Sequence, residues 1–315
     1  MEKPTSDEKI LAALAHASVI FAFFGPLAPT LIWANQRNKS KYVRFHALQA
    51  MGYQALTFWV WFIGIFVFLF GGIILVILAG AFLSETTSFD PEFFPFILQP
   101  LIMLTMFGLW GLFFLIGIVG AVFCMIDRDF NYPLIGRWLK KQIFNGQATE
   151  AEMEEWEDNW VSGICHSTAI LQLWGMITPL VVWFSQKERS LKLRFQAMQA
   201  TLYQLIAFAA YMIGMGAYMV FFFAMMAGLF LFAPEASSTG PAGDLSPAAG
   251  IGLLIFVGIF MLIYLIAIIA TPIYFLLAAI ASILTIRGRN FKYPILGNIL
   301  LRRMNPTIIE GAPRS

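Results

Sequence analysis

The sequence predicts an all-α polytopic membrane protein built from a tandem-duplicated helical module. Hydrophobic residues make up 59% of the chain and charged residues only 12%, and the mean hydropathy is +0.76. These values lie outside the range of soluble domains. Six apolar stretches without any charged side chain are each long enough to cross a hydrocarbon core about 30 Å thick. They are residues 10–36, 45–83, 98–126, 159–184, 195–234 and 251–286.

The duplication is visible as identities at a constant offset. Residues 16–54 align without a gap on residues 166–204, and 14 of these 39 pairs are identical. A second block, residues 128–133, returns as residues 289–294 and keeps the pattern Arg-x-Phe-x-Tyr-Pro. A duplicated unit of roughly 130 residues predicts two structurally similar halves. We therefore expect a first membrane repeat at 1–145, an acidic cytoplasmic linker at 146–158 and a second membrane repeat at 159–315.

The distribution of basic residues predicts the orientation in the membrane. Loops 84–97 and 235–250 contain no Lys or Arg. By the positive-inside rule these two loops face outward and the basic segments face the cytoplasm. We expect an integral protein of the bacterial cytoplasmic membrane. All 20 Lys and Arg residues lie in the N-terminal segment and in segments 37–44, 128–141, 187–194 and 287–314.

The first apolar stretch of each repeat poses a topological problem. If it crossed completely, each repeat would have three spans, and the second repeat would be inverted relative to the first. Inverted repeats should have opposite charge bias, yet both repeats carry basic residues at matching positions. A segment that enters and returns on one side removes the conflict, because Pro interrupts helical hydrogen bonding. We therefore predict four long transmembrane helices plus two re-entrant or broken first segments, with six full spans as the alternative. The predicted helix breaks are Gly25, Pro26, Pro29, Gly175 and Pro179.

The remaining elements follow from capping residues and amphipathic patterns. Ser40 and Ser190 are predicted N-caps of helices that run through residues 83 and 233. Each helix is about 60 Å long at 1.5 Å per residue, so its first turns should protrude or lie among headgroups. Residues 134–141 and 295–303 combine apolar and basic faces, which is typical of short interfacial helices that bind anionic lipid.

The linker between the repeats is strongly acidic. Thr149 and Glu152 have the spacing of a capping box. The pattern predicts a short cytoplasmic helix or a solvated linker.

A polar pattern recurs inside the apolar sequence after Ser40 and Ser190. Amide and phenol groups that faced lipid would be costly, so these side chains should face protein, water or headgroups. They either form hydrogen bonds across helices or line a polar vestibule or partner groove between the repeats. The candidates are Arg44, His46, Gln49, Tyr53 and Gln54 in the first repeat and Arg194, Gln196, Gln199, Tyr203 and Gln204 in the second.

The sequence predicts no catalytic residue, cofactor or metal site. His16 and His166 occupy matching positions and could face each other, but a metal site needs further ligands. Cys165 beside His166 is the only nearby candidate, so packing or a hydrogen bond is the favoured interpretation for both histidines. Cys124 and Cys165 are expected to be buried apolar thiols. Nucleotide-binding, zinc-protease and serine-hydrolase motifs are absent from the sequence.

Short motifs resemble a known family. Residues 42–50, Tyr-Val-Arg-Phe-His-Ala-Leu-Gln-Ala, resemble the aromatic-Val-Arg-Phe-x-Ala-x-Gln-Ala signature of the Tic-twenty family, a chloroplast inner-envelope protein-import component. Segments 14–18, 25–27 and 132–135 resemble its bacterial relatives of unknown function. In the second half the match is looser, since Leu193 stands where the first half has Val43. The resemblance implies an α-helical membrane protein with a role related to protein import.

Three classes of function fit the chain to different degrees. A non-enzymatic scaffold, assembly factor or accessory subunit of a membrane complex agrees with the short loops and with the lack of catalytic motifs. A translocation or transport component would use the polar vestibule, yet transporters usually carry membrane-embedded charge and the apolar stretches have none. An intramembrane enzyme would need a nucleophile or an acid pair. Expected partners are the bilayer, with anionic lipid at the basic segments, and other membrane proteins, but not nucleic acid.

Overall fold

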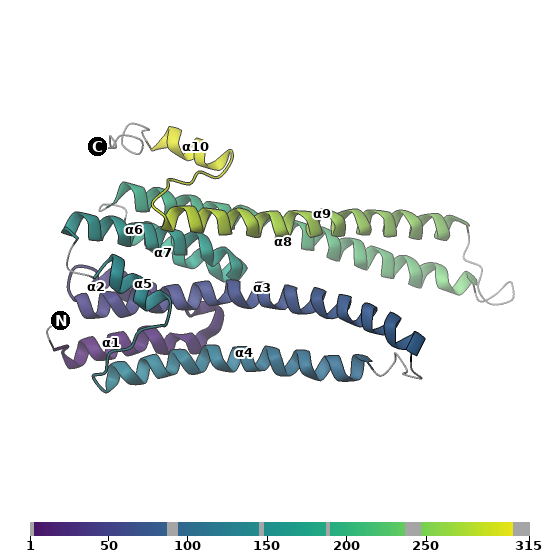
Figure 1. Ribbon diagram of the computed structural model, residues 1–315. Coiled ribbons are helices and arrows are strands. Elements are labelled where there is room, and N and C mark those ends of the chain that lie inside the picture. The colour runs from purple at the N-terminus through teal and green to yellow at the C-terminus, as the bar shows by residue number, and fades with distance from the viewer. Residues whose placement is uncertain (1–2, 87–93, 145–147, 187–189, 237–246, 305–315) are drawn as a thin grey trace.

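The computed structural model describes residues 3–86, 94–144, 148–186, 190–236 and 247–304, and every regular element in this part of the chain is a helix. The two repeats have the same order of elements (Figure 1). This confirms the all-α, duplicated architecture. The first repeat contains α1 (Ser6–Ala17), the 3-10 helix η1 (Ser18–Phe24), α2 (Leu27–Gln36), α3 (Lys41–Thr86), α4 (Phe94–Met125) and α5 (Ile135–Gln142). The second contains α6 (Glu150–Ser167), η3 (Thr168–Met176), α7 (Ile177–Gln186), α8 (Leu191–Ala236), α9 (Pro247–Ile286) and α10 (Leu296–Arg303).

The first segment of each repeat reverses direction. In Figure 1, α1 runs away from the N-terminus and α2 returns beside it to the start of α3. The reversal contains one strained residue, Ala22 (φ 48°, ψ −107°), and its counterpart Gln172 (φ 53°, ψ −124°). A positive φ is costly for a residue with a Cβ, so the surrounding packing must hold this turn in place.

The predicted helix breaks lie next to the strained residue. A Cβ added to Gly25 would lie 2.7 Å from Gln54 Oε1, and one added to Gly175 would lie 1.8 Å from the carbonyl oxygen of Thr168. Glycine is therefore required for close approach. Pro26 is the N-cap of α2, whereas Pro29 and Pro179 lie in the first turns of α2 and α7, where Pro is tolerated.

Four uninterrupted apolar helices remain once the hairpins are recognised. In the part of the chain that the structure describes, five helical segments could cross a membrane by length and composition. One of them, Glu150–Gln186, consists of α6, η3 and α7 and turns back at Gln172. The other four are Lys41–Phe82, Gln99–Met125, Leu191–Gly228 and Gly250–Ile286, which lie in α3, α4, α8 and α9.

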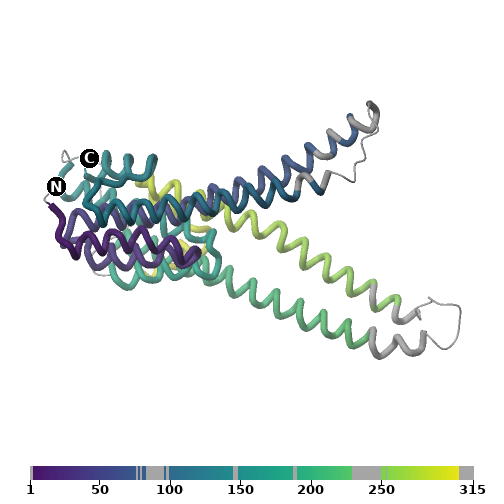
Figure 2. The backbone as a smooth tube through the Cα atoms, turned by 90° about the horizontal axis from the view of Figure 1, so that it is seen from below, coloured from purple at the N-terminus to yellow at the C-terminus, as the bar shows by residue number. Residues whose placement is uncertain are grey.

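The long helices have a buried part and an exposed part. Ser40 Oγ accepts a hydrogen bond from the Val43 amide (3.2 Å) and Ser190 Oγ accepts one from the Leu193 amide (3.2 Å), which confirms both predicted N-caps. The first turns of α3 and α8 pack among the other helices at one compact end of the molecule, and the expectation that they lie beyond the hydrocarbon core stays a prediction. Beyond the compact end, the α3–α4 and α8–α9 pairs diverge as two arms (Figure 2). The two loops expected to face outward lie largely outside the described residues.

The compact end joins both repeats through one core. The Trp160 ring fills the space over Gly52, where an added Cβ would lie 2.2 Å from the ring. Trp160 Nε1 donates to the Leu48 carbonyl oxygen (3.2 Å), and Trp59 Nε1 donates to the Ser167 carbonyl oxygen (2.8 Å). These contacts cross between the repeats, so neither half is a separate body at this end.

The short helices pack on protein more closely than the sequence predicted. The side chain of Leu139 in α5 is fully buried, and the Trp138 ring lies 5.0 Å from the ring of Trp160. In α10, Leu300 is also buried. The amphipathic pattern therefore serves largely to dock these helices on the compact end.

The acidic segment between the repeats is not a solvated linker throughout. The capping box of Thr149 and Glu152 is present, which confirms a helix start there. However, α6 continues without a break into the second repeat, and Glu157 and Asp158 are buried. The expectation of a solvated segment up to residue 158 is wrong at its C-terminal end, because both carboxylates find cationic partners in the first repeat.

Candidate functional site

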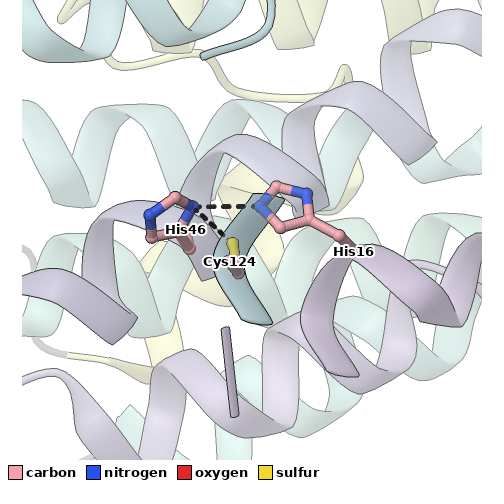
Figure 3. Close-up of side chains that lie close together, drawn as sticks. All are labelled: His16, His46 and Cys124. Carbon is pink, nitrogen blue, oxygen red and sulfur yellow. Dashed lines mark hydrogen bonds between the residues drawn. The ribbon is translucent and has the colours of Figure 1, made fainter. Parts of the chain in front are cut away.

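Three side chains from three helices meet inside the first repeat. His16 comes from α1, His46 from α3 and Cys124 from the end of α4 (Figure 3). The distance from His16 Nε2 to His46 Nδ1 is 3.1 Å, and the distance from Cys124 Sγ to His46 Nδ1 is 3.5 Å. All three residues are buried. The α1–α2 hairpin makes this meeting possible, because it places α1 against both α3 and α4.

Neighbouring groups fix the orientation of this cluster. The hydroxyl of Tyr132 lies 3.0 Å from His16 Nδ1. Burial raises the pKa of Tyr132, so this phenol stays protonated at neutral pH. The Gln49 amide nitrogen donates to the Phe130 carbonyl oxygen (3.0 Å) and lies 3.0 Å from His46 Nδ1. Its oxygen accepts a hydrogen bond from the Tyr132 amide (3.3 Å), so the amide orientation is set from both sides.

The second repeat keeps the frame but replaces two of the three side chains. His166 Nδ1 lies 3.2 Å from the Tyr293 hydroxyl, as in the first repeat. Its Nε2 faces Gln196 Oε1 at 2.9 Å, where the first repeat has His46. Thr285 stands at the position of Cys124 and donates to the Ala281 carbonyl oxygen. This copy is a neutral hydrogen-bonded core.

The other glutamine and tyrosine candidates bond within their own repeat. Gln54 Nε2 donates to the Ala15 carbonyl oxygen (3.0 Å), and Gln204 Nε2 donates to the Cys165 carbonyl oxygen (3.0 Å). Gln199 repeats the role of Gln49, since its amide bonds the backbone of residues 291 and 293. The two tyrosines do the same, with Tyr53 donating to the Phe113 carbonyl oxygen and Tyr203 to the Tyr274 carbonyl oxygen, both at 3.0 Å. This geometry favours hydrogen bonding across helices over a shared vestibule.

A buried ion-pair network crosses between the repeats. Glu157 of α6 forms ion pairs with Arg37 (3.4 Å) and Arg44, and Trp33 Nε1 donates to the same carboxylate. Arg37 also contacts Asp158 Oδ1 at 2.7 Å. Arg194, the counterpart of Arg44, forms no ion pair among the described residues, although the Nε atoms of both arginines lack a hydrogen-bond partner there. The network therefore belongs to the junction and is not repeated.

Sequence reasoning missed the cluster of His16, His46 and Cys124. It favoured packing or a hydrogen bond for His16 and His166 and considered that they could face each other; in the structure each histidine contacts partners of its own repeat. Cys124 is 78 residues from His46, so no helical spacing connects them. The sequence did contain one signal: the second repeat has Gln196 in place of His46 and Thr285 in place of Cys124.

The sequence matches the magnetosome magnetite crystal formation protein family, MamF/MmsF, in two copies over residues 7–139 and 157–300. The chain belongs to this family. The two matched segments coincide with the two helical repeats, so each repeat is one MamF/MmsF unit. No curated protein sequence and no solved structure matches the chain.

Membership of the MamF/MmsF family overturns the resemblance to the Tic-twenty family and the role in protein import that it implied. The motif at residues 42–50 has a structural explanation. Val43, Phe45 and Ala47 are buried in the core, and Gln49 holds the backbone of the 130–132 segment. Such a short pattern describes how a helix packs into this kind of core and is too short to identify a family.

Proposed function

We propose that the protein is a non-enzymatic accessory subunit of the magnetosome membrane that organises other membrane proteins around the forming magnetite crystal. The observation that carries the proposal is the division of the molecule into a hydrogen-bonded core and four long apolar helices in two arms. The process in the proposal, magnetite crystal formation, is taken from the family to which the chain belongs. The apolar helices agree with a place in the membrane that surrounds the crystal.

The polar groups of the core support a structural role. The glutamines and tyrosines of the two repeats donate to backbone carbonyl oxygens of neighbouring segments, so these side chains themselves are satisfied inside the core. Buried polar groups of this kind cost stability unless they are satisfied. The long helices carry no charged side chain over residues 45–83, 98–126, 195–234 and 251–286, whereas ion-coupled transport usually depends on such groups.

The arms provide surface for partners. Val60, Leu104, Ile213 and Leu254 are each more than 70% exposed, and they are spread over all four long helices. In a bilayer these faces contact lipid or neighbouring helices, where association depends on close packing. Because the arms diverge, both pairs present faces that another membrane protein can cover.

We further propose that the compact end lies on the cytoplasmic side. Among the described residues, the basic side chains belong to α1, the α2–α3 turn, the α4–α5 segment, the start of α8 and the α9–α10 segment, which lie at this end of the molecule (Figure 1). Lys or Arg near a membrane surface favours the cytoplasmic face and anionic lipid. The proposed partners are therefore anionic lipid at the compact end and other magnetosome membrane proteins along the arms.

Deletion of the gene in its magnetite-forming host tests the proposal. We expect crystals of altered size or shape inside magnetosome membranes that still form, as measured by electron microscopy. Affinity purification of the full chain from these membranes should recover other magnetosome membrane proteins. Normal crystals in the deletion strain would contradict the role. Solute flux through liposomes that contain only this protein would assign transport instead.

A further inference from the structure

We propose that His16, His46 and Cys124 form a binding site for one divalent transition-metal ion, of which Zn²⁺ is the best match. The inference is independent of the proposed function, because it rests on this cluster alone. One ligand atom from each residue, His16 Nε2, His46 Nδ1 and Cys124 Sγ, lies within 4.8 Å of the other two. Imidazole and thiolate ligands together are typical of Zn²⁺ sites.

The spacing of the ligand atoms fits a tetrahedral ion. With bonds of about 2.0–2.1 Å to nitrogen and 2.3 Å to sulfur, tetrahedral geometry places two nitrogens about 3.3 Å apart and a nitrogen and a sulfur about 3.6 Å apart. The observed distances are 3.1 Å between the two imidazole nitrogens and 3.5 Å between His46 Nδ1 and Cys124 Sγ. Two of the three ligand separations therefore already match a tetrahedral ion, and all three ligand atoms lie within 4.8 Å of one another.

Hydrogen bonding alone satisfies this cluster poorly. His46 Nδ1 has one lone pair, and three groups crowd it: His16 Nε2, the Gln49 amide nitrogen and Cys124 Sγ. The amide nitrogen of Gln49 must point this way because its oxygen already accepts from Tyr132. An ion between the two histidines and Cys124 uses the lone pairs of all three, so that His16 and Cys124 no longer compete as donors to His46 Nδ1. In the second repeat, by contrast, Gln196 and Thr285 leave no such conflict.

The hydrogen bonds around the three side chains also fit a role as metal ligands. A metal-binding histidine normally donates its second ring N–H to a fixed partner. Tyr132 supplies this partner for His16 Nδ1 at 3.0 Å, which leaves Nε2 free to bind the ion. Binding transfers the thiol proton of Cys124 to solvent, and the thiolate forms the bond to the metal. Three protein ligands leave the fourth position for water or another small ligand.

A polar cavity lies next to the cluster on the far side of Tyr42. It has a volume of about 540 Å³ and is lined by Tyr42, Asp127, Asp129 and other residues at the compact end. The ring of Tyr42 also lies 4.4 Å from the ring of His46. Tyr42 therefore separates the cavity from the cluster, and rotation of its side chain would connect the two.

Titration of the metal-free, detergent-solubilised full chain with Co²⁺ tests the site. We expect one equivalent of Co²⁺ to bind, with visible d–d bands and a near-ultraviolet thiolate-to-cobalt band, and Zn²⁺ to displace it. Cys124→Thr should abolish the thiolate band, and His46→Gln should weaken binding more than about tenfold, since even outer partners of ligands contribute 10–100-fold. Both variants carry residues that the second repeat already uses at these places, so the fold should tolerate them.

Two matched changes complete the test. Cys165→Ser should leave the thiolate band unchanged, because Cys165 is buried outside the cluster. The double change Gln196→His and Thr285→Cys should raise the stoichiometry to two equivalents. Circular dichroism and size-exclusion chromatography verify that each variant is folded. The proposal is overturned if the wild-type chain shows no thiolate band, if the band survives Cys124→Thr, or if it disappears with Cys165→Ser.

Discussion

Buried ion pairs lie at the junction of the repeats. Glu157 is fully buried and holds two arginines of the first repeat. A buried ion pair gives little net stability relative to an apolar pair, but removing one partner leaves an uncompensated charge. The junction therefore fixes how the two repeats fit together.

Glu157→Gln should destabilise the protein strongly. Arg37 would keep Asp158 as its partner, whereas Arg44 would lose its carboxylate. We expect a loss of about 3–5 kcal/mol in the free energy of unfolding. A thiol-reactive dye measures it during heating in detergent, because both cysteines are buried in the folded chain.

A matched control is Glu155→Gln. Glu155 pairs with Lys192 at 3.6 Å, but its side chain is 65% exposed. Exposed pairs contribute about 0–1 kcal/mol, so the unfolding temperature should hardly change. Equal effects of the two substitutions would show that the buried network does not stabilise the junction.

At the scale of elements, the broken hairpins position the polar core. They return the chain to the start of α3 and α8 and bring α1 and α6 against the long helices. Their tight turns depend on glycines that leave no space for a side chain. In this arrangement His16 lies beside both His46 and Tyr132.

Gly175→Ala tests the turn of the second hairpin. The new Cβ would overlap the Thr168 carbonyl oxygen, so the backbone must shift. We expect a loss of about 1–3 kcal/mol, as found for overpacked sites. The control, Gly214→Ala in α8, has no neighbouring atom within 4 Å and should be neutral or gain up to about 1 kcal/mol from helix propensity. Thermal unfolding in detergent compares the two, and an unaffected Gly175 variant would contradict the tight turn.

At the scale of the whole molecule, the hairpins determine which ends share a side of the membrane. With re-entrant first segments, the N-terminus and the α2–α3 turn lie at the same end of the molecule (Figure 1). The two arms extend from that end, and their exposed surface is apolar (Figure 2). Both repeats then point the same way, as their matching basic segments require.

Labelling of single cysteines in membrane vesicles checks this topology. Ser6→Cys and Asn38→Cys, both at exposed positions, should react with an impermeant maleimide from the same side, and Ser88→Cys from the opposite side. The native cysteines should not interfere, because they are buried. Labelling of positions 6 and 38 from opposite sides would support six full spans.

The sequence by itself determined the class, the duplication and the long helices. Hydropathy, repeat offsets and the caps at Ser40 and Ser190 are local signals, and each is visible in a short window. The polar candidates were also found, because amides in an apolar helix need partners wherever they point.

Only the tertiary structure decided which residues meet. Cys124 joins the histidines through packing of α4 against α1, and the acidic Glu157 enters the core because two arginines of the other repeat surround it. Contacts between helices that are far apart in the sequence do not produce a periodic pattern of residues. The turn residue, Ala22, was missed for a related reason, since its strained backbone is held by neighbours and not by its own conformational preference.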